Sequence, residues 1–215
     1  MGKKRLEDAI QKLSYPVKVD YRCFELDPTM ERDVSYSIYE KLASKYGMSI
    51  EQAKANCDNM EKMAQEVGLD FRFDLQKLTN TFDAHRLVMY AKTQGLMHEM
   101  TERILRAYYT EGKHIGDHAT LITLADDVGL DSNATEAMLA STDFSDTVRQ
   151  DEKQADQYNI RSIPFFLVNK KYGISGAQPT EAFVQSLEQI IEQDGLRVTQ
   201  PGISCDEDGC DIPEK

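Results

Sequence analysis

Apolar residues near the start of the chain recur every three or four positions, at Leu6, Ala9, Ile10 and Leu13. This spacing is typical of an amphipathic helix and predicts one over residues 3–14. After Pro16 the apolar residues stand at every second position, which predicts a strand over residues 17–26. Asp27-Pro28 ends this strand, because proline lacks a backbone donor.

Helical spacing returns at about residue 33 and continues to about residue 158, apart from residues 69–75, which alternate and are expected to be extended. Gly47 is expected to end the first of these helices. Ser49 and Gln52 form a capping box, which predicts the start of the next one. Further helices are expected at about residues 81–94, 97–111, 118–128, 133–141 and 144–158.

The last part of the chain contains two short apolar runs joined by Lys170-Lys171. Residues 165–169 and 172–177 are therefore predicted to form a β-hairpin. A final helix is expected from Pro179-Thr180 to Gly195.

This order of elements predicts an α/β fold with a helical insertion. Residues 1–30 and 158–195 are expected to form the α/β domain, and residues 31–157 the insertion. Residues 196–215 have no apolar period and are expected to form a tail with a Cys-x4-Cys spacing.

Charge limits the classes of partner. The 37 acidic and 25 basic residues give a net charge of −12, and the basic residues are scattered. This distribution argues against nucleic acid and anionic membrane as main partners. No run approaches the roughly 18 apolar residues of a membrane span. Four cysteines in 215 residues favour a reducing, cytoplasmic setting.

Five short blocks stand in a fixed order, from Gly2 to Glu7, Phe24 to Pro28, Asn80 to Leu87, Ile163 to Phe166 and Ile174 to Gln178. Together they resemble the FrnE-like branch of the DsbA family of disulfide oxidoreductases, over residues 2 to about 194. Kappa-class glutathione transferases and 2-hydroxychromene-2-carboxylate isomerases are relatives that share the third block. The resemblance implies a thioredoxin-like fold with a large all-helical insertion.

In that family a strand and a Cys-Pro-x-Cys turn precede the helix with which this sequence begins. The resemblance therefore implies a chain truncated at its N-terminus, without the first strand and both catalytic cysteines. A mis-assigned start, a shortened sequence and a genuine gene truncation are the explanations considered. Lys3, Lys4 and Arg5 fit this interpretation, because cations in a first helical turn oppose the helix dipole unless an anion such as a thiolate is near. These three residues are expected to give electrostatic support.

The predicted substrate groove consists of Ile163, Pro164 and His85. In the family the position of Pro164 is a cis-proline beside the active cysteines, whereas an ordinary edge-strand proline would be trans. His85 is placed by the resemblance on a helix that faces the active-site cleft. Without the resemblance, it would be interpreted as a hydrogen-bonded structural histidine.

Cys205 and Cys210 are the only cysteines close to each other in sequence. Their acidic neighbours should raise the thiol pKa and slow thiolate chemistry. A loose tail, a secondary redox pair and a metal clamp remain open for them, although two thiols alone do not close a zinc site. Cys23 and Cys57 are expected to be small core residues, and no metal site is predicted.

The leading hypothesis is a cytoplasmic thiol–disulfide oxidoreductase whose catalytic pair is missing from this chain. Its expected partner is a disulfide-bearing protein or a small thiol, and it needs no cofactor. A glutathione-dependent isomerase or transferase, with glutathione as cofactor, is the second hypothesis. A catalytically inactive binding module is the third. An unpaired sheet edge predicts association, for example as a homodimer.

Overall fold

A computed structural model describes residues 1–196, 205–206 and 209–210. The chain divides into two compact units, which are described separately. One contains Gly2–Lys18 and the chain from Phe166 onward, and the other contains Met1 and Val19–Phe165. These boundaries differ from the limits expected for the α/β domain and the insertion, and the domain assignment itself stays a prediction.

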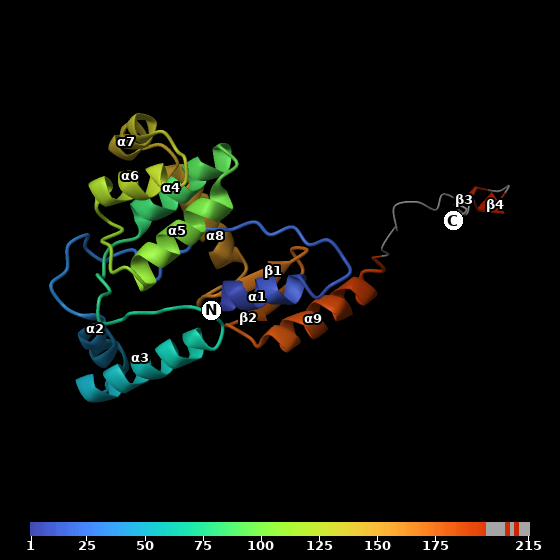
Figure 1. Cartoon of the computed structure of the whole chain (residues 1–215), viewed down its shortest axis with the longest axis horizontal. Helices are drawn as coiled ribbons and strands as arrows, with labels where there is room; N and C mark the ends of the chain where they lie inside the picture. The colour runs from blue at the N-terminus through green and yellow to red at the C-terminus, as the bar shows by residue number, and fades with distance from the viewer. Residues whose placement is uncertain (197–204, 207–208, 211–215) are drawn as a thin grey trace. The chain divides into compact units, whose positions relative to one another are not determined.

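The unit that contains the N-terminal helix consists of two helices and most of a hairpin. Its elements are α1 (Gly2–Ile10), β1 (Phe165–Val168), β2 (Tyr172–Ser175) and α9 (Thr180–Gln193). Helices α1 and α9 pack side by side (Figure 1). Phe183 of α9 is fully buried, and its ring lies edge-on to Phe166 at 4.8 Å between centroids. The apolar stripes predicted for both helices therefore meet in one small core.

The hairpin forms where it was predicted. Asn169 and Lys170, at its turn, have φ values of 51° and 56°. Positive φ at both central residues is the mark of a type I′ turn, whose twist matches that of paired strands. The carboxylate of Asp194 accepts hydrogen bonds from the Tyr172 hydroxyl at 2.7 Å and from Asn169 at 2.9 Å, and so it fastens the hairpin to the end of α9.

The strand predicted over residues 17–26 is not present, and that prediction was wrong. These residues have no regular structure, and in the described part of the chain β1 pairs only with β2. A strand is stable only when a neighbour takes up its backbone hydrogen bonds. Here the alternating pattern has no neighbouring strand, so it folds without a ladder.

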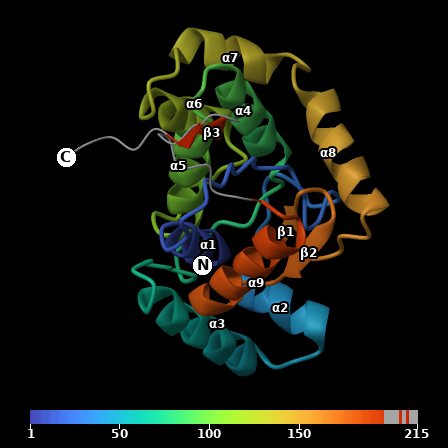
Figure 2. The same ribbon diagram turned by 90° about the vertical axis from the view of Figure 1, so that its right-hand side faces the viewer.

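The larger unit contains seven helices among the described residues. They are α2 (Ile38–Tyr46), α3 (Ile50–Gln65), α4 (Phe82–Thr93), α5 (Met97–Tyr109), α6 (His118–Asp126), α7 (Ser132–Ala140) and α8 (Ser145–Gln157). Helix α4 touches each of the four helices that follow it, and Figure 2 shows them gathered around it. Its fully buried Leu87 packs with Met100, Leu121 and Val148 from three of these helices. The core of this unit is therefore built on α4.

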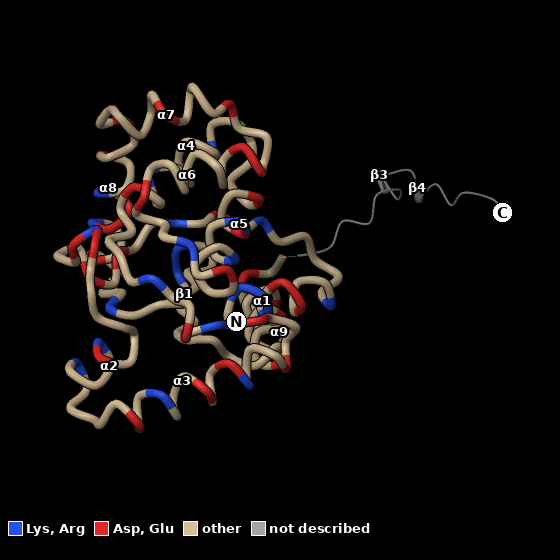
Figure 3. The backbone as a smooth tube through the Cα atoms, turned by 60° about the vertical axis from the view of Figure 1, so that its left-hand side comes forward, with Lys and Arg blue, Asp and Glu red and all other residues tan. Residues whose placement is uncertain are grey.

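Helices α2 and α3 form a separate hairpin that is defined by its caps. Ser49 and Gln52 make the predicted capping box, and Ser37 and Glu40 make a second one. Gly47 ends α2 in the left-handed conformation, as expected. Acidic and basic residues are interspersed along α3 (Figure 3), and no residue of α2 is buried. Capping side chains therefore satisfy backbone amide groups at the start of both helices.

The loop at Gly116, before α6, packs so closely against its neighbours that no side chain fits at this position. A Cβ atom on Gly116 would lie 2.1 Å from the Thr79 hydroxyl and 3.2 Å from the Asn80 carbonyl oxygen. Thr79 in turn donates a hydrogen bond of 2.7 Å to the carbonyl of Arg32. This contact fixes the entrance to α4.

Candidate functional site

Ile163 and Pro164 lie immediately before β1. Their peptide bond is cis, as the resemblance predicted. The Ile163 side chain is exposed, at 46% of its surface, although it is a large apolar residue. An exposed apolar residue at the start of a strand is available to contact a ligand, and the groove role of both residues stays a prediction.

His85 lies on α4 and is half-buried. Its ring hydrogen-bonds to the backbone of Phe24, and Asp151 and Glu152 of α8 are close enough to affect its charge. Burial lowers the pKa of His85, although the two carboxylates act in the opposite direction. The His85 imidazole is therefore neutral at pH 7, and it hydrogen-bonds to backbone that has no regular secondary structure. Its expected place in a substrate groove remains a prediction.

Part of the region where a strand was expected, residues 22–25, is called the 22–25 segment. Side chains of α8 form hydrogen bonds and ion pairs with its backbone and its charged side chains. The Asp151 carboxylate accepts from the Cys23 amide and from the Arg22 guanidinium, both at 3.0 Å. Arg149 donates to Glu25 at 2.6 Å and to Glu152 at 2.6 Å. These contacts replace the missing strand ladder at this segment.

Sequence reasoning missed this arrangement. Glu25 and Arg149 are 124 positions apart, and no local motif joins them. The one available signal was Arg149, Asp151 and Glu152 close together on a helix, beside the apolar Val148 and Ala155. Charged residues that flank an apolar stripe can mark a helix that binds polar groups at its buried edge.

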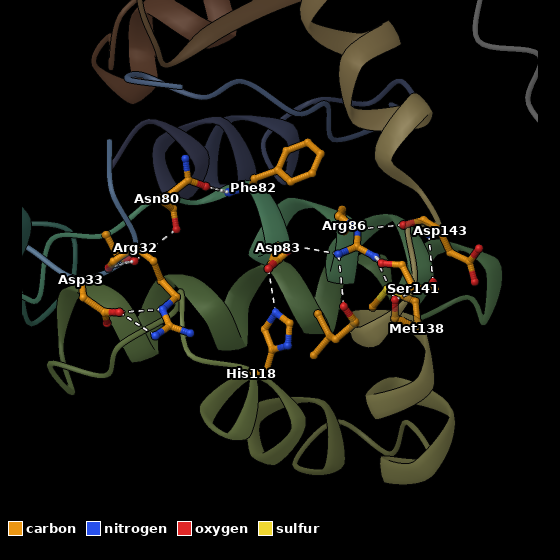
Figure 4. A network of polar contacts seen from close by, with 12 residues as sticks. Arg32, Asp33, Asn80, Phe82, Asp83, Arg86, His118, Met138, Ser141 and Asp143 are labelled. Atoms are coloured by element: carbon orange, nitrogen blue, oxygen red, sulfur yellow. Dashed lines mark hydrogen bonds and ion pairs between the residues drawn. The ribbon is translucent and has the colours of Figure 1, made fainter. Parts of the chain in front are cut away.

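A second polar network includes Asp83 and Arg86 of α4 (Figure 4). The Arg86 guanidinium donates to the carbonyl oxygens of Met138, Ser141 and Asp143 at 2.7–2.8 Å, and to the Asp83 carboxylate at 2.7 Å. The other oxygen of Asp83 lies 2.7 Å from His118 Nε2. Arg86 thus satisfies carbonyls left open at the end of α7, which is a structural task.

Burial alone would raise the pKa of Asp83, but the hydrogen bonds from His118 and Arg86 outweigh it and lower the pKa. His118 itself begins α6, and Asp117 caps that helix through the Thr120 amide at 2.8 Å. Among the described residues no group of three or more His, Cys, Asp and Glu side chains could hold a metal ion.

The basic residues at the start of α1 have partners. Lys3 and Lys4 form ion pairs with Glu7 and Asp8 one turn later. Arg5 donates to the Ala177 carbonyl at 2.7 Å. These contacts place three cations in the first two turns of the helix, and their support of an anion there stays a prediction.

Cys23 and Cys57 are buried and free, which confirms the prediction that they are core residues. Burial raises the pKa of both thiols, and the Asp151 carboxylate adds to the effect on Cys23. Both are therefore poor nucleophiles at neutral pH. The backbone at Cys205 pairs with that at Cys210 across the short antiparallel strands β3 (Cys205–Asp206) and β4 (Gly209–Cys210). The side chains of this pair lie outside the described residues.

No helix in the described part of the chain is long and apolar enough to cross a membrane.

The chain is similar to known proteins over nearly its full length. A probable DsbA oxidoreductase from Streptomyces coelicolor is 35% identical, with a TM-score of 0.85 over 99% of this chain and 93% of that one. A 2-hydroxychromene-2-carboxylate isomerase has a TM-score of 0.66 at 15% identity, over 90% of each chain. The cytosolic disulfide reductase DsbM from Pseudomonas aeruginosa, solved with GSH, has a TM-score of 0.60 at 18% identity, over 89% of this chain and 92% of that one.

The last two likenesses show a shared fold. The sequence model of the DSBA-like thioredoxin domain matches residues 1–188. This match and the 35% identity together show that the chain belongs to the DsbA-like thioredoxin-fold family.

Proposed function

We propose that this protein is a thiol–disulfide oxidoreductase of the DsbA type. The observation that carries the proposal is the 35% identity with a probable DsbA oxidoreductase over 99% of the chain. The 215 residues contain no Cys-x-x-Cys. They would therefore act on a thiol that they do not themselves contain.

Their contribution begins at α1. A thiolate at the start of this helix would be stabilised by the open amide groups of the first turn and by Lys3, Lys4 and Arg5. It would attack one sulfur of a substrate disulfide, forming a mixed disulfide and releasing the other sulfur as a thiolate. The second cysteine would then break the mixed disulfide, so that the pair is oxidised and the substrate reduced.

Ile163 and Pro164 are proposed to bind the substrate backbone, with His85 in the same groove. The exposure of the Ile163 side chain supports this role. The expected substrate is a disulfide-bearing protein or a small thiol, and a cytoplasmic location is part of the proposal. The name of DsbM, a cytosolic disulfide reductase, is consistent with that location. Association as a homodimer is also proposed, because among the described residues β1 pairs only with β2 and has one unpaired edge.

Cys205 and Cys210 are proposed as a secondary redox pair. Residues directly opposed on antiparallel strands have Cα atoms about 4.5–5.5 Å apart, which is within the range of a disulfide. The backbone register of β3 and β4 supports this pairing. The acidic residues between them favour a resolving role over a primary nucleophile.

The second candidate function is a glutathione-dependent isomerase or transferase. Its support is the fold shared with the 2-hydroxychromene-2-carboxylate isomerase. A lone Ser or Cys before α1 would favour it, and a Cys pair would favour the oxidoreductase. A binding module without catalysis is the third reading, and it requires that neither residue type is present.

The test compares two proteins. One is the 215-residue chain, and the other carries an apolar strand ending in Cys-Pro-Tyr-Cys before Met1. We expect the extended protein to reduce insulin disulfides with turnover in the presence of a thiol reductant, and the shorter one to be inactive. The matched control replaces both new cysteines with serine. A folded but inactive extended protein would contradict the proposal, and turnover by the shorter chain that is lost in C205S/C210S would make the tail pair catalytic.

A further inference from the structure

The cluster formed by Glu25, Arg149 and Glu152 joins the 22–25 segment to α8. Arg149 Nη1 is the common donor, at 2.6 Å from Glu25 Oε2 and 2.6 Å from Glu152 Oε2. The Glu25 side chain is completely buried, the Glu152 side chain is 20% exposed and the Arg149 side chain is 51% exposed. The Arg149 guanidinium also lies over the Phe82 ring, 4.2 Å from its centroid.

The two carboxyl groups each have one oxygen that the arginine does not satisfy. Glu25 Oε1 and Glu152 Oε1 are buried and have no hydrogen-bond partner. Because the other oxygen of each group lies 2.6 Å from the same Arg149 nitrogen, the two carboxyl groups are neighbours. Two carboxylates cannot bond to each other, since both only accept, but a carboxylic acid donates to a carboxylate. One proton between them therefore satisfies both groups.

The charged groups around the cluster also indicate that it holds one added proton. Asp151 is paired with Arg22, whose guanidinium also contacts Asp20. On α4, His85 is neutral and bonded to the backbone of Phe24, and the Cys23 thiol is protonated. Arg149 therefore faces two carboxyl groups alone. Without an added proton the cluster holds a net negative charge beside a fully buried side chain, which is strongly unfavourable.

We propose that Glu25 and Glu152 share one proton in the folded protein at a pH where an exposed glutamate has already lost its own, and that loss of this proton weakens the attachment of the 22–25 segment to α8. The attachment is then a pH-sensitive contact within the larger unit. This contact is independent of the redox chemistry proposed above. None of the residues proposed for that chemistry takes part in it, although His85 lies nearby.

The direction of the effect follows from the proton count. Burial is the main cause that raises the pKa of Glu25, with the hydrogen bond to Glu152 adding to it and Arg149 opposing it. The folded protein therefore keeps a proton that the unfolded chain loses above its ordinary glutamate pKa of about 4.3. Stability falls as the pH rises from that value through the folded-state pKa.

The first measurement is a 13C NMR titration of the side-chain carboxyl groups in the whole chain. We expect one glutamate signal, assigned by its loss in Glu25→Gln or Glu152→Gln, to titrate above the ordinary glutamate range. The proposal is overturned if both signals titrate in or below that range. The variants serve only to assign the signals, and the wild-type titration curve decides the outcome.

The second measurement follows attachment of the segment itself. Cys23 is almost fully buried, so a thiol reagent reaches it only when the segment opens. With Cys57, Cys205 and Cys210 replaced by serine, the labelling rate of Cys23 is compared between Glu25 and Glu25→Gln proteins. The glutamine amide donates as the acid does and carries no charge.

We expect the labelling rate of the Glu25 protein, divided by that of Glu25→Gln, to increase by about fivefold or more as the pH rises from about 4.5 to about 8, because only Glu25 loses its proton. Glu136→Gln, at an exposed position of α7, is the matched control. The labelling rate of Cys23 in the Glu136 protein, divided by that in Glu136→Gln, should not change with pH. A ratio that is constant with pH in the Glu25 comparison overturns the proposal.

Discussion

Two arginines of the larger unit bind buried acceptors in opposite ways. Arg86 is buried, and its donors reach three carbonyl groups and one carboxylate whose other oxygen is bonded to His118. Arg149 is half-exposed and bridges two carboxyl groups, each of which keeps an unsatisfied oxygen. The first network has charges that balance without any proton exchange. The second balances only with an added proton, and so one network is structural and the other responds to pH.

The largest effect is expected from Arg86→Met. It leaves several buried carbonyls and the Asp83 carboxylate without their donor, which should lower the free energy of unfolding by roughly 3–5 kcal/mol. Urea unfolding at pH 7 measures it. Arg106→Met is the matched control, because that side chain is 73% exposed and its change should cost under about 0.5 kcal/mol. A loss of less than 1 kcal/mol for Arg86→Met would remove the structural role.

Arg149→Met should cost about 1–3 kcal/mol at pH 8, where it leaves two carboxyl groups without a cation. The cost should be smaller at pH 5, since Glu25, whose pKa is raised by burial, can then hold a proton. Urea unfolding at the two pH values measures the difference. Arg86→Met, whose partner Asp83 has a lowered pKa, should cost the same at both. If the stability losses of the two variants changed with pH in the same way, the two networks would not differ in their response to pH.

Asp83→Asn should cost about 1–2 kcal/mol at pH 7. The pKa of Asp83 is lowered in the folded protein, so its carboxylate stabilises the fold above the unfolded value of about 3.9, and this is lost as the pH falls through the folded-state pKa. Thermal unfolding from pH 7 to pH 3 should show wild type and variant converging. If wild type and variant differed in stability by the same amount down to pH 3, the charge of the Asp83 carboxylate would not be what stabilises the fold.

His118→Ala should have the smallest effect, under about 0.5 kcal/mol, because the histidine side chain is 44% exposed. Its removal should still raise the pKa of Asp83, which loses one of its two main donors. An NMR titration of Asp83 in both proteins checks this. An unchanged titration would assign the low pKa to Arg86 alone.

Features encoded by neighbouring residues were predicted well from sequence. The capping box at Ser49 and the hairpin at residues 165–177 depend on contacts a few positions apart, and both are present. The prediction of a strand at residues 17–26 failed because pairing depends on a distant partner that alternation cannot reveal. The contact between Glu25 and Arg149 was missed for the same reason. Asp83 and Arg86, three apart among apolar residues of α4, could have been recognised as an ion pair.

The contact at Gly116 has a consequence for which sequences this fold accepts. The φ value there is not in the left-handed region, so backbone conformation would permit any residue, and only the missing space excludes them. The added methyl of an alanine would press on Thr79, Asn80 and the Arg32 side chain together. In a library of single substitutions, Gly116 should therefore reject even alanine, whereas Gly129, with open space around it but a φ of 87°, should accept asparagine better than other residues. Two glycines of one unit would then be retained for different reasons, one for lack of space and the other for its backbone conformation.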